Sequence, residues 1–222
     1  MKAKLNASIF GISCVIGENI VSLDSQVDIF YNGNLKKLNK IKNTIGLNTR
    51  CITSATTLDL AIQACKGLFK NIDKAEITSV IFVTQSPNYL QPNNASLLHE
   101  KFNLNESCAC FDVNLGCSGY VYGLYLAYLM SPFNNKILLI CGDTMSKCVK
   151  SDDSNTAPLF GDACSATIIQ SGDSTAYFNL NTAGGGQYAI LIVLFLETIG
   201  ILIYKWMVER FLISLYQKNL NQ

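Results

Sequence analysis

Apolar and polar residues follow different periods along the chain, and these periods predict a succession of strands and helices. Strands are predicted at residues 4–13, 78–84, 108–113 and 136–141. Helices are predicted at residues 21–42, 54–70, 93–102 and 117–130. The second and fourth strands are short apolar runs of the kind found in strands that are buried on both faces. Strands that alternate with helices predict an α/β domain built on a mostly parallel sheet.

Two further segments are predicted from their turn residues. Residues 85–92 contain two prolines and are predicted to form a loop between a strand and a helix. Residues 162–170 and 174–180 are predicted to pair as a hairpin around residues 171–173 (Ser-Gly-Asp). The reason is that glycine and small polar residues favour tight turns.

The last part of the sequence has a different character. Residues 190–204 are almost wholly apolar and are interrupted only by Glu197, Thr198 and Gly200. The run is shorter than the ~20 residues that span a bilayer, and a carboxylate near its centre is costly in lipid. We therefore interpret it as a buried helix, with a membrane segment as the alternative.

The composition fits a globular protein and excludes recognition through overall charge. The chain has 222 residues, of which 49% are hydrophobic and 15% are charged, enough for one domain with a sizeable core. Its formal net charge of +1 creates no field that would attract nucleic acid or anionic lipid. We therefore expect no nucleic-acid partner, and a membrane partner is disfavoured.

Nine cysteines and a single histidine, His99, narrow the chemistry further. No Cys-x-x-Cys pair occurs, so we expect no metal site. We interpret His99 as a partly exposed surface residue. Thiols in such number indicate a reducing compartment, and the amino terminus lacks the long apolar stretch of a signal peptide. These observations predict a cytoplasmic protein.

One cysteine is distinguished by its position. Residues 111–119 read Phe-Asp-Val-Asn-Leu-Gly-Cys-Ser-Gly, so that a strand ends, a glycine-flanked turn follows, and a helix begins at Cys117. Unpaired N–H groups and the dipole at a helix amino terminus favour a thiolate, the species that attacks a thioester carbonyl. The alternative is a small buried cysteine that only packs at the strand–helix junction. The local pattern alone leaves both interpretations open.

Residues 112–119 closely resemble the nucleophile segment of the ketoacyl-(acyl carrier protein) synthase III family, which belongs to the thiolase-fold condensing enzymes. Gly116 stands where that family commonly has alanine. Four other segments are similar to family motifs and follow in the same order: Gly-Leu-Asn-Thr-Arg at 46–50, Thr-Gln-Ser-Pro-Asn-Tyr-Leu-Gln-Pro at 84–92, Gly-Asp-Thr-Met-Ser at 142–146 and Leu-Phe-Gly-Asp-Ala at 159–163. The resemblance extends over residues 1–190, and five segments in order make it specific.

This resemblance implies a fold and an activity. The implied fold is α/β and thiolase-like, the first half of an αβαβα duplication, with residues 1–188 as an amino-terminal domain. Cys117 is implied as the catalytic nucleophile that takes an acyl group from acyl-CoA. The acyl-cysteine would then condense with malonyl-acyl carrier protein, which loses carbon dioxide, as in fatty acid biosynthesis.

The resemblance also bears on binding residues, cofactors and partners. It places Arg50 near the coenzyme A entrance as a substrate-binding residue, with a structural ion pair as the alternative. We interpret Asp162 as a structural turn residue whose carboxylate binds backbone N–H groups. No metal or other cofactor is implied. The implied partners are acyl-CoA, the acyl carrier protein and a second copy of the chain, since the intact family is homodimeric.

The family's second half supplies a catalytic histidine and asparagine, and no histidine follows His99 in this chain. Read one base earlier, the codons for residues 205–214 are compatible with Met-Asp-Gly-Gly-Glu-Val-Phe-Asn-Phe-Ser, which resembles a segment of that second half. Our hypothesis is that residues 189–222 are an apolar, aberrant tail translated out of frame. The first interpretation is therefore a truncated and impaired acyltransferase. The alternatives are a catalytically inactive fragment or non-catalytic dimerisation module, and a membrane-anchored protein.

Overall fold

The structure is a computed structural model that describes residues 1–132 and 135–182. It divides into two compact units. The larger unit comprises residues 1–22, 49–148 and 161–180, and the smaller one includes residues 23–48 and 149–160. The apolar run at 190–204 and the hypothetical tail at 189–222 lie outside the described residues. Among the helices that are described, none has both the length and the apolar character needed to cross a bilayer.

A five-stranded sheet forms the centre of the larger unit, in the order β1-β7-β6-β4-β5. Its strands are β1 (Lys2–Ile16), β4 (Ile77–Val83), β5 (Ala109–Val113), β6 (Lys136–Thr144) and β7 (Asp162–Asn179). β4 pairs in parallel with β5 and β6, whereas β7 runs antiparallel to both β6 and β1. The predicted strands are confirmed, but the sheet is mixed and not mostly parallel. The three parallel strands present their carboxyl ends at the same end of the sheet.

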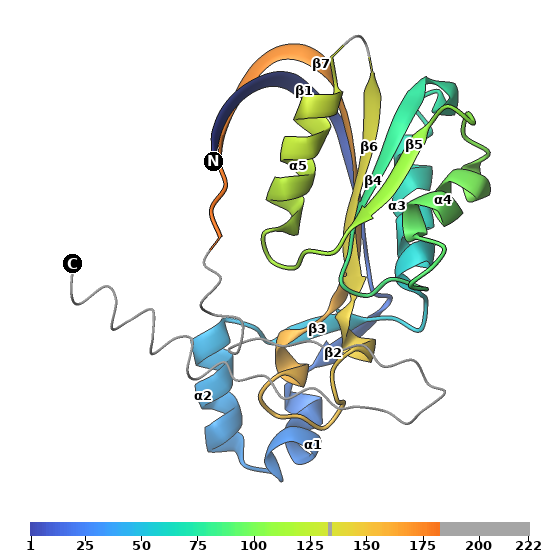
Figure 1. Ribbon diagram of the computed structural model, residues 1–222. Coiled ribbons are helices and arrows are strands. Elements are labelled where there is room, and N and C mark those ends of the chain that lie inside the picture. The colour runs from blue at the N-terminus through green and yellow to red at the C-terminus, as the bar shows by residue number, and fades with distance from the viewer. Residues whose placement is uncertain (133–134, 183–222) are drawn as a thin grey trace. The chain divides into compact units, whose positions relative to one another are not determined.

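The hairpin predicted around residues 171–173 is wrong, because these residues lie inside one continuous strand, β7. β6 accompanies β7 only as far as Gln170, and beyond that point β7 continues along β1 to Asn179. Figure 1 shows the paired ends of β1 and β7 arching away from the rest of the sheet. The β1–β7 ladder is interrupted by a bulge near Ser8, and a methyl group on Gly172 would lie 2.0 Å from Ser8 Oγ. The small residues therefore permit a close approach at a bulge, and they do not make a turn.

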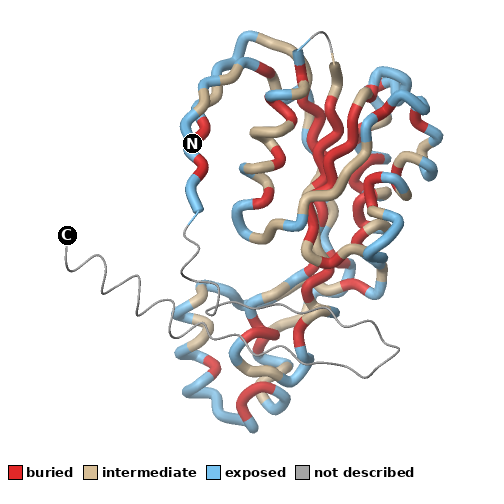
Figure 2. Tube along the Cα trace, in the orientation of Figure 1, coloured by how far each residue is buried: buried red, intermediate tan, exposed pale blue. Residues whose placement is uncertain are grey.

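Helices cover both faces of the sheet (Figure 1). α3 (Thr57–Leu68) and α4 (Asn94–Phe102) lie on one face, and α5 (Gly119–Met130) lies on the other. Figure 2 shows buried residues concentrated in the central strands. All but one of the residues of β4 are buried, as predicted for a strand that lies between two helical layers.

Capping residues determine where the helices of the α3–α4 face begin. The Thr56 hydroxyl accepts a hydrogen bond from the Asp59 N–H at 3.1 Å, and the Asp59 carboxylate accepts one from the Thr56 N–H at 2.9 Å. This reciprocal arrangement is a capping box. Asn93 caps α4 by accepting a hydrogen bond from the Ser96 N–H at 3.3 Å. Both predicted helices are confirmed.

The helix predicted at residues 21–42 is not continuous: residues 21 and 22 end β2 (Asn19–Ser22), and two separate helices follow in the smaller unit. α1 (Val27–Tyr31) ends at Asn32, which has a left-handed φ of 50°, and Gly33 follows with φ of 74°. Asn34 then caps α2 (Leu35–Ile45) by accepting a hydrogen bond from the Lys37 N–H at 3.0 Å. Asparagine and glycine tolerate positive φ better than other residues. The Asn-Gly-Asn sequence therefore interrupts a helical pattern that looks continuous in hydrophobicity.

A two-stranded antiparallel sheet, formed by β2 (Asn19–Ser22) and β3 (Thr49–Ile52), belongs to the larger unit. β2 follows directly on β1, and Gly17 between them lies against Ile52, where a methyl group would be 2.6 Å from the carbonyl carbon. The next residue after β3, Thr53, donates its N–H to the Asp162 carboxylate at 2.9 Å. Asp162 pairs with Thr144 at the carboxyl end of β6. β3 is therefore tied to the end of the main sheet where the parallel strands terminate.

Candidate active site

Cys117 lies in the tight turn between β5 and α5, and its side chain is exposed to solvent. The strand ends at Val113, and a hydrogen bond from the Gly119 N–H to the Gly116 carbonyl oxygen, 2.7 Å long, closes the turn. Helix α5 begins at Gly119. The predicted order of strand, glycine-flanked turn and helix is confirmed. The alternative of a cysteine buried at this junction is wrong.

The amino terminus of α5 keeps backbone donors that its N-cap side chain does not bind. Ser118 occupies the N-cap position, and its side chain makes no capping hydrogen bond. The first helical hydrogen bond runs from the Tyr122 N–H to the Ser118 carbonyl oxygen at 3.2 Å. The earlier N–H groups of a helix have no partner inside it and point out of its amino end. Here that end carries Cys117, where their positive potential stabilises a thiolate or a developing oxyanion.

Two glycines bring the start of α5 close to the sheet. A methyl group on Gly119 would lie 2.5 Å from Val83 Cγ1, and one on Gly123 would lie 2.6 Å from Leu139 Cδ1. These distances are well inside van der Waals contact, so a side chain at either position would push the helix away from β4 and β6. The glycines thereby fix the position of the Cys117 turn relative to the carboxyl ends of these strands.

A polar network orders the loop that follows β4. Asp143, near the carboxyl end of β6, accepts four hydrogen bonds on its Oδ1 atom. The donors are the Thr84 hydroxyl and the Gln85 N–H, both at 2.7 Å, and the N–H and hydroxyl of Ser86, both at 2.9 Å. The Ser86 hydroxyl also lies 2.9 Å from the Thr57 hydroxyl at the start of α3. Three elements are thus joined at the end of the sheet that carries Cys117.

Gln85 and Asp143 also belong to this region, although neither was predicted as a site residue. Each of them lies close to the carboxyl end of a parallel strand, β4 or β6. In open α/β sheets the carboxyl ends of parallel strands are the usual place for ligand sites. Polar residues at these two strand ends were therefore the signal that could have identified them.

Asp112 belongs to the same sequence motif as Cys117, but its role is structural. Its carboxylate accepts hydrogen bonds from the N–H groups of Asn94 and Ala95, at 2.8 and 2.9 Å. Burial raises the pKa of this carboxyl group, and the two N–H groups oppose that shift. Both oxygens are used at the start of α4, so Asp112 anchors that helix to β5.

Asp162 is buried, and its carboxylate binds backbone donors as predicted, but it is the first residue of β7 and does not lie in a turn. Its carboxylate accepts hydrogen bonds from the N–H groups of Thr53 and Ser146, both at 2.9 Å, and from the Ser146 hydroxyl at 2.6 Å. It therefore joins the residue that follows β3 to the chain that follows β6.

Arg50 lies on β3, opposite Val21 of β2. Burial lowers the pKa of its guanidinium, and the nearby negative charge of Asp162 opposes that shift. The structure thus brings Arg50 to the same end of the larger unit as Cys117, although Arg50 lies in the two-stranded sheet and Cys117 follows a strand of the five-stranded sheet. The nearby charge of Asp162 fits the alternative interpretation, in which Arg50 forms a structural ion pair.

His99 lies on α4, where its Nε2 atom is 2.9 Å from the Asn105 carbonyl oxygen. It is partly exposed, as predicted. Across residues 1–132 and 135–182, no three side chains of histidine, cysteine, aspartate or glutamate are grouped so that they could hold a metal ion.

All nine cysteines fall within the described residues and are free thiols. Burial raises the pKa of four of them: Cys65, Cys141, Cys148 and Cys164. Cys110 on β5 behaves differently, because a hydrogen bond from the Cys108 thiol lowers its pKa to about 7 and raises that of Cys108. Cys110 is therefore a second candidate for a reactive thiol, besides Cys117.

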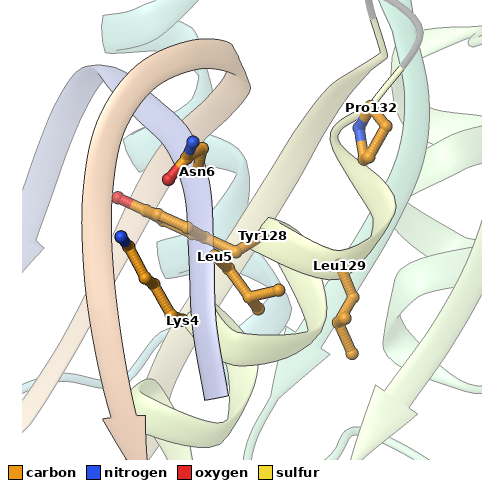
Figure 3. Close-up of a pocket in the computed structure, with 6 residues that line it drawn as sticks. All are labelled: Lys4, Leu5, Asn6, Tyr128, Leu129 and Pro132. Atoms are coloured by element: carbon orange, nitrogen blue, oxygen red, sulfur yellow. The ribbon is translucent and has the colours of Figure 1, made fainter.

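A cavity of about 350 Å³ lies between β1 and the carboxyl-terminal part of α5. It is lined by Lys4, Leu5, Asn6, Tyr128, Leu129 and Pro132. Figure 3 shows Tyr128 extending from the helix toward Lys4 and Asn6 on the strand. Cys117 precedes the opposite end of this helix of 12 residues, which is about 18 Å long at a rise of 1.5 Å per residue. The cavity therefore does not belong to the thiol site.

Comparison with known proteins connects this geometry to one family. The sequence model of the family described as 3-oxoacyl-[acyl-carrier-protein (ACP)] synthase III matches residues 111–184, which include Cys117. A putative 3-oxoacyl-[acyl-carrier-protein] synthase 3 from Campylobacter jejuni is 39% identical over 191 residues, which cover 83% of this chain and 54% of that protein. A beta-ketoacyl-[acyl-carrier-protein] synthase III from Coxiella burnetii is 30% identical over 198 residues, which cover 84% and 59% of the two chains.

A solved structure gives the same result for the fold. The crystal structure of a 3-oxoacyl-(acyl-carrier protein) synthase from Burkholderia xenovorans matches with a TM-score of 0.80 and 30% identity. The match covers 85% of this chain and 56% of that one. The predicted thiolase-like α/β fold is confirmed by this match. The chain spans about half the length of the curated relatives that it matches.

Proposed function

Because the chain belongs to the 3-oxoacyl-[acyl-carrier-protein] synthase III family over the part that it spans, we propose that it is an acyltransferase with Cys117 as its nucleophile. The observation that carries the proposal is the exposed Cys117 thiol at the uncapped start of α5. The thiolate attacks the thioester carbonyl of acyl-CoA. The tetrahedral intermediate places its negative oxygen near N–H groups at the helix amino terminus. It then expels the coenzyme A thiolate, which takes up the proton that Cys117 has lost, and an acyl-cysteine remains.

The second step of the proposed reaction joins this acyl group to a carrier-bound substrate. Malonyl-acyl carrier protein loses carbon dioxide, and the resulting carbanion attacks the acyl-cysteine, forming a carbon–carbon bond and releasing the Cys117 thiolate. The family resemblance implies a histidine and an asparagine for this step, and no histidine follows His99 in this chain. We therefore infer that the chain by itself accepts an acyl group and does not complete the condensation. Thioesters are its only substrates, and no metal or redox cofactor takes part.

Arg50 is proposed as a substrate-binding residue. Its guanidinium carries five donors in a planar fork that suits phosphate groups such as those of coenzyme A. Its position at the Cys117 end of the larger unit supports this role. Arg50→Ala should raise the acyl-CoA concentration that gives half the maximal rate of Cys117 acylation, without lowering the thermal midpoint, and Arg50→Lys should give an intermediate concentration. A lowered thermal midpoint with an unchanged half-maximal concentration would instead establish Arg50 as the structural partner of Asp162.

Two features support the proposed homodimer and the proposed cytoplasmic location. β5 is the last strand of the sheet, and among the described residues its outer side pairs with no strand. An edge strand of this kind can pair with a second copy of the chain. Nine free thiols fit a reducing compartment. The acyl carrier protein is proposed as the partner that delivers the malonyl group.

A second candidate is a catalytically inactive fragment or a non-catalytic dimerisation module. The observation that favours it is the absence of any histidine after His99 in the sequence. The two candidates differ in whether Cys117 reacts with a thioester, because a module that only associates with another chain has no need of an accessible nucleophile.

Acylation measured by intact mass distinguishes the candidates. The purified chain is incubated with acetyl-CoA and with longer acyl-CoA thioesters, and the modified peptide is mapped. We expect a mass gain of one acyl group on Cys117, its loss in Cys117→Ala, and its retention in Cys14→Ala, which removes another exposed thiol. A folded wild-type chain that gains no acyl group would support the inactive module. Equal acylation of the Cys117→Ala variant would show that Cys117 is not the nucleophile.

A further inference from the structure

The side chain of Gln85 occupies the place that a side chain at position 116 would take. A methyl group on Gly116 would lie 2.6 Å from Gln85 Oε1, 2.9 Å from Cδ and 3.0 Å from Nε2. All three atoms of the carboxamide group are thus close to one point, so the group lies flat against the Gly116 backbone. The next residue in the chain is Cys117.

Gln85 is held in this place from the main chain. Its N–H donates to Asp143 Oδ1 at 2.7 Å, and the same oxygen binds both neighbours of Gln85, through the Thr84 hydroxyl and through the N–H and hydroxyl of Ser86. Hydrogen bonds to an ionised carboxylate are shorter and stronger than bonds between neutral groups. The backbone of Gln85 is therefore fixed at the point from which its carboxamide reaches Gly116.

The carboxamide group itself is not used by this network. Gln85 is half-buried, and in the described part of the chain its side chain has no hydrogen-bond partner. The contact that the structure shows for this group is a steric one, with the turn that carries Cys117.

We infer that Gln85 is a positioning residue for acyl transfer, that it sets the conformation of the Gly116–Cys117 turn, and that Asp143 is its anchor. The inference rests on the proposed function, because it assumes that Cys117 accepts the acyl group. Gly116 and Gln85 form a matched pair in which the missing side chain of one leaves room for the other. Misplacement of a reacting group by about 1 Å can cost ~10²-fold in rate.

A double-mutant cycle tests this pairing. The variants are Gly116→Ala, Gln85→Ala and the combination of both, and the rate of Cys117 acylation by acetyl-CoA is measured by intact mass. We expect Gly116→Ala to lower the rate by roughly 10- to 10²-fold and the double variant to recover part of this loss, because Gln85→Ala removes the clash. Multiplicative effects, with a double variant slower than either single variant, would overturn the inference.

Further variants separate positioning from folding. Gln85→Ala should slow Cys117 acylation while its thermal midpoint stays at that of Gln63→Ala, a control that truncates an exposed glutamine on α3. Asp143→Asn, which keeps the shape of the side chain and removes its charge, should slow acylation in the same direction. If Gly116→Ala does not fold, recovery of a cooperative thermal transition in the double variant supports the pairing, and an unfolded double variant counts against it.

A readout that does not need a thioester keeps this inference distinct from the proposed function. Alkylation of Cys117 by iodoacetamide is followed from about pH 6 to pH 9, across the range in which thiols ordinarily titrate. Gln85→Ala should change the rate profile of Cys117 and leave that of Cys14 unchanged. If the wild-type chain is not acylated but this profile still changes, the proposed function fails and the positioning role of Gln85 stands. If acylation occurs and neither rate responds to Gln85→Ala, the positioning role fails alone.

Discussion

The helices α3 and α5 have 12 residues each and lie on opposite faces of the same sheet, yet they are built differently. α3 begins with a capping box and keeps charged or polar residues such as Asp59, Gln63 and Lys66 on its outer side. α5 begins without a side-chain cap and carries no charged residue at all. A helix that is apolar on every side is typical of one that is buried on every side.

The difference shows that the start of α3 favours stability, whereas the start of α5 favours the chemistry of the Cys117 site. A capping box satisfies the first N–H groups of a helix and so removes them from chemistry. At the start of α5 the N-cap side chain, that of Ser118, makes no such hydrogen bond, and the Cys117 turn lies there. The missing side-chain cap makes α5 less stable as an isolated helix. The same absence makes its amino end suitable for a thiolate and an oxyanion.

The largest expected effect concerns the chemistry on the α5 side. The purified chain, supplied with acyl-CoA and malonyl-acyl carrier protein, should form no ketoacyl product, because no histidine follows His99, whereas the family resemblance implies a catalytic one in that part. Loss of even one oxyanion donor typically lowers a rate by ~10²–10³. Product analysis by mass spectrometry, with the full-length Campylobacter jejuni protein run in parallel, measures this. Product formation at a rate similar to that of the relative would refute the expectation.

The next prediction tests whether the outer side of α5 is incomplete. Val121 and Leu129, eight residues apart on α5, are 47% and 44% exposed. Each large apolar side chain left in water forfeits roughly 1.5–3 kcal/mol, against a typical total stability of ~5–15 kcal/mol. We therefore expect the chain to self-associate or aggregate and not to behave as a stable monomer.

Light scattering during size-exclusion chromatography measures this association. Val121→Lys combined with Leu129→Lys should shift the chain toward the monomer. Gln63→Lys combined with Asn71→Lys adds the same charge at exposed positions in and just after α3 and should leave the association unchanged. A wild-type chain that elutes as a sharp monomer peak and melts cooperatively would contradict the expectation that the outer side of α5 drives association.

Substitutions that add a methyl group should destabilise the two helices unequally, and this difference is expected to be smaller than the effects above. Gly123→Ala places a methyl group 2.6 Å from Leu139 Cδ1, so α5 must shift or β6 must repack. Overpacking of this kind costs typically about 1–3 kcal/mol. Gly67→Ala on α3 is the matched control, because there the methyl group would meet the Ser13 side chain and not the hydrocarbon core. Urea denaturation should show the larger loss for Gly123→Ala, and equal losses would contradict the argument.

The fold was predictable where local signals agree with long-range packing. The β4 run and the glycines around Cys117 each specify an element by themselves, and both predictions are confirmed. Residues 171–173 looked like a turn because the close approach of β1 cannot be seen in the local sequence. Gln85 and Asp143 were missed for a related reason. They are 58 residues apart, and their contact exists only because β4 and β6 are neighbours.

The comparison extends to the thiols on the two faces of the sheet. Cys110 packs on the α3–α4 side, and the Cys108 thiol lowers its pKa to about 7. The lowered pKa gives Cys110 a larger thiolate fraction at neutral pH than an ordinary cysteine has. Cys108→Ala removes the donor, so the pKa of Cys110 should rise and its alkylation at pH 7 should fall.

Peptide mapping after iodoacetamide treatment reads this change at single cysteines. Cys117 should remain the fastest-labelled thiol in both proteins, because it combines exposure with a helix amino terminus. Cys110 should come second in the wild-type chain only. If Cys110 outpaces Cys117, then thiol acidity and not position decides reactivity, and the assignment of the nucleophile loses its main support.

The smallest expected effect tests the cap difference itself. Thr56→Ala removes the hydroxyl that accepts a hydrogen bond from the Asp59 N–H and donates to the Asp59 carboxylate, so it should lower the free energy of unfolding by about 1 kcal/mol. Ser118→Ala alters the same position of α5, but its hydroxyl makes no capping bond. Its effect should therefore stay within about 0.5 kcal/mol, as for substitutions that break no specific interaction. Urea denaturation of both variants gives the two values. If Ser118→Ala costs as much as Thr56→Ala, then Ser118 caps the helix in solution. The first N–H groups of α5 would then already be satisfied, and the stabilisation of an oxyanion beside Cys117 would need another source.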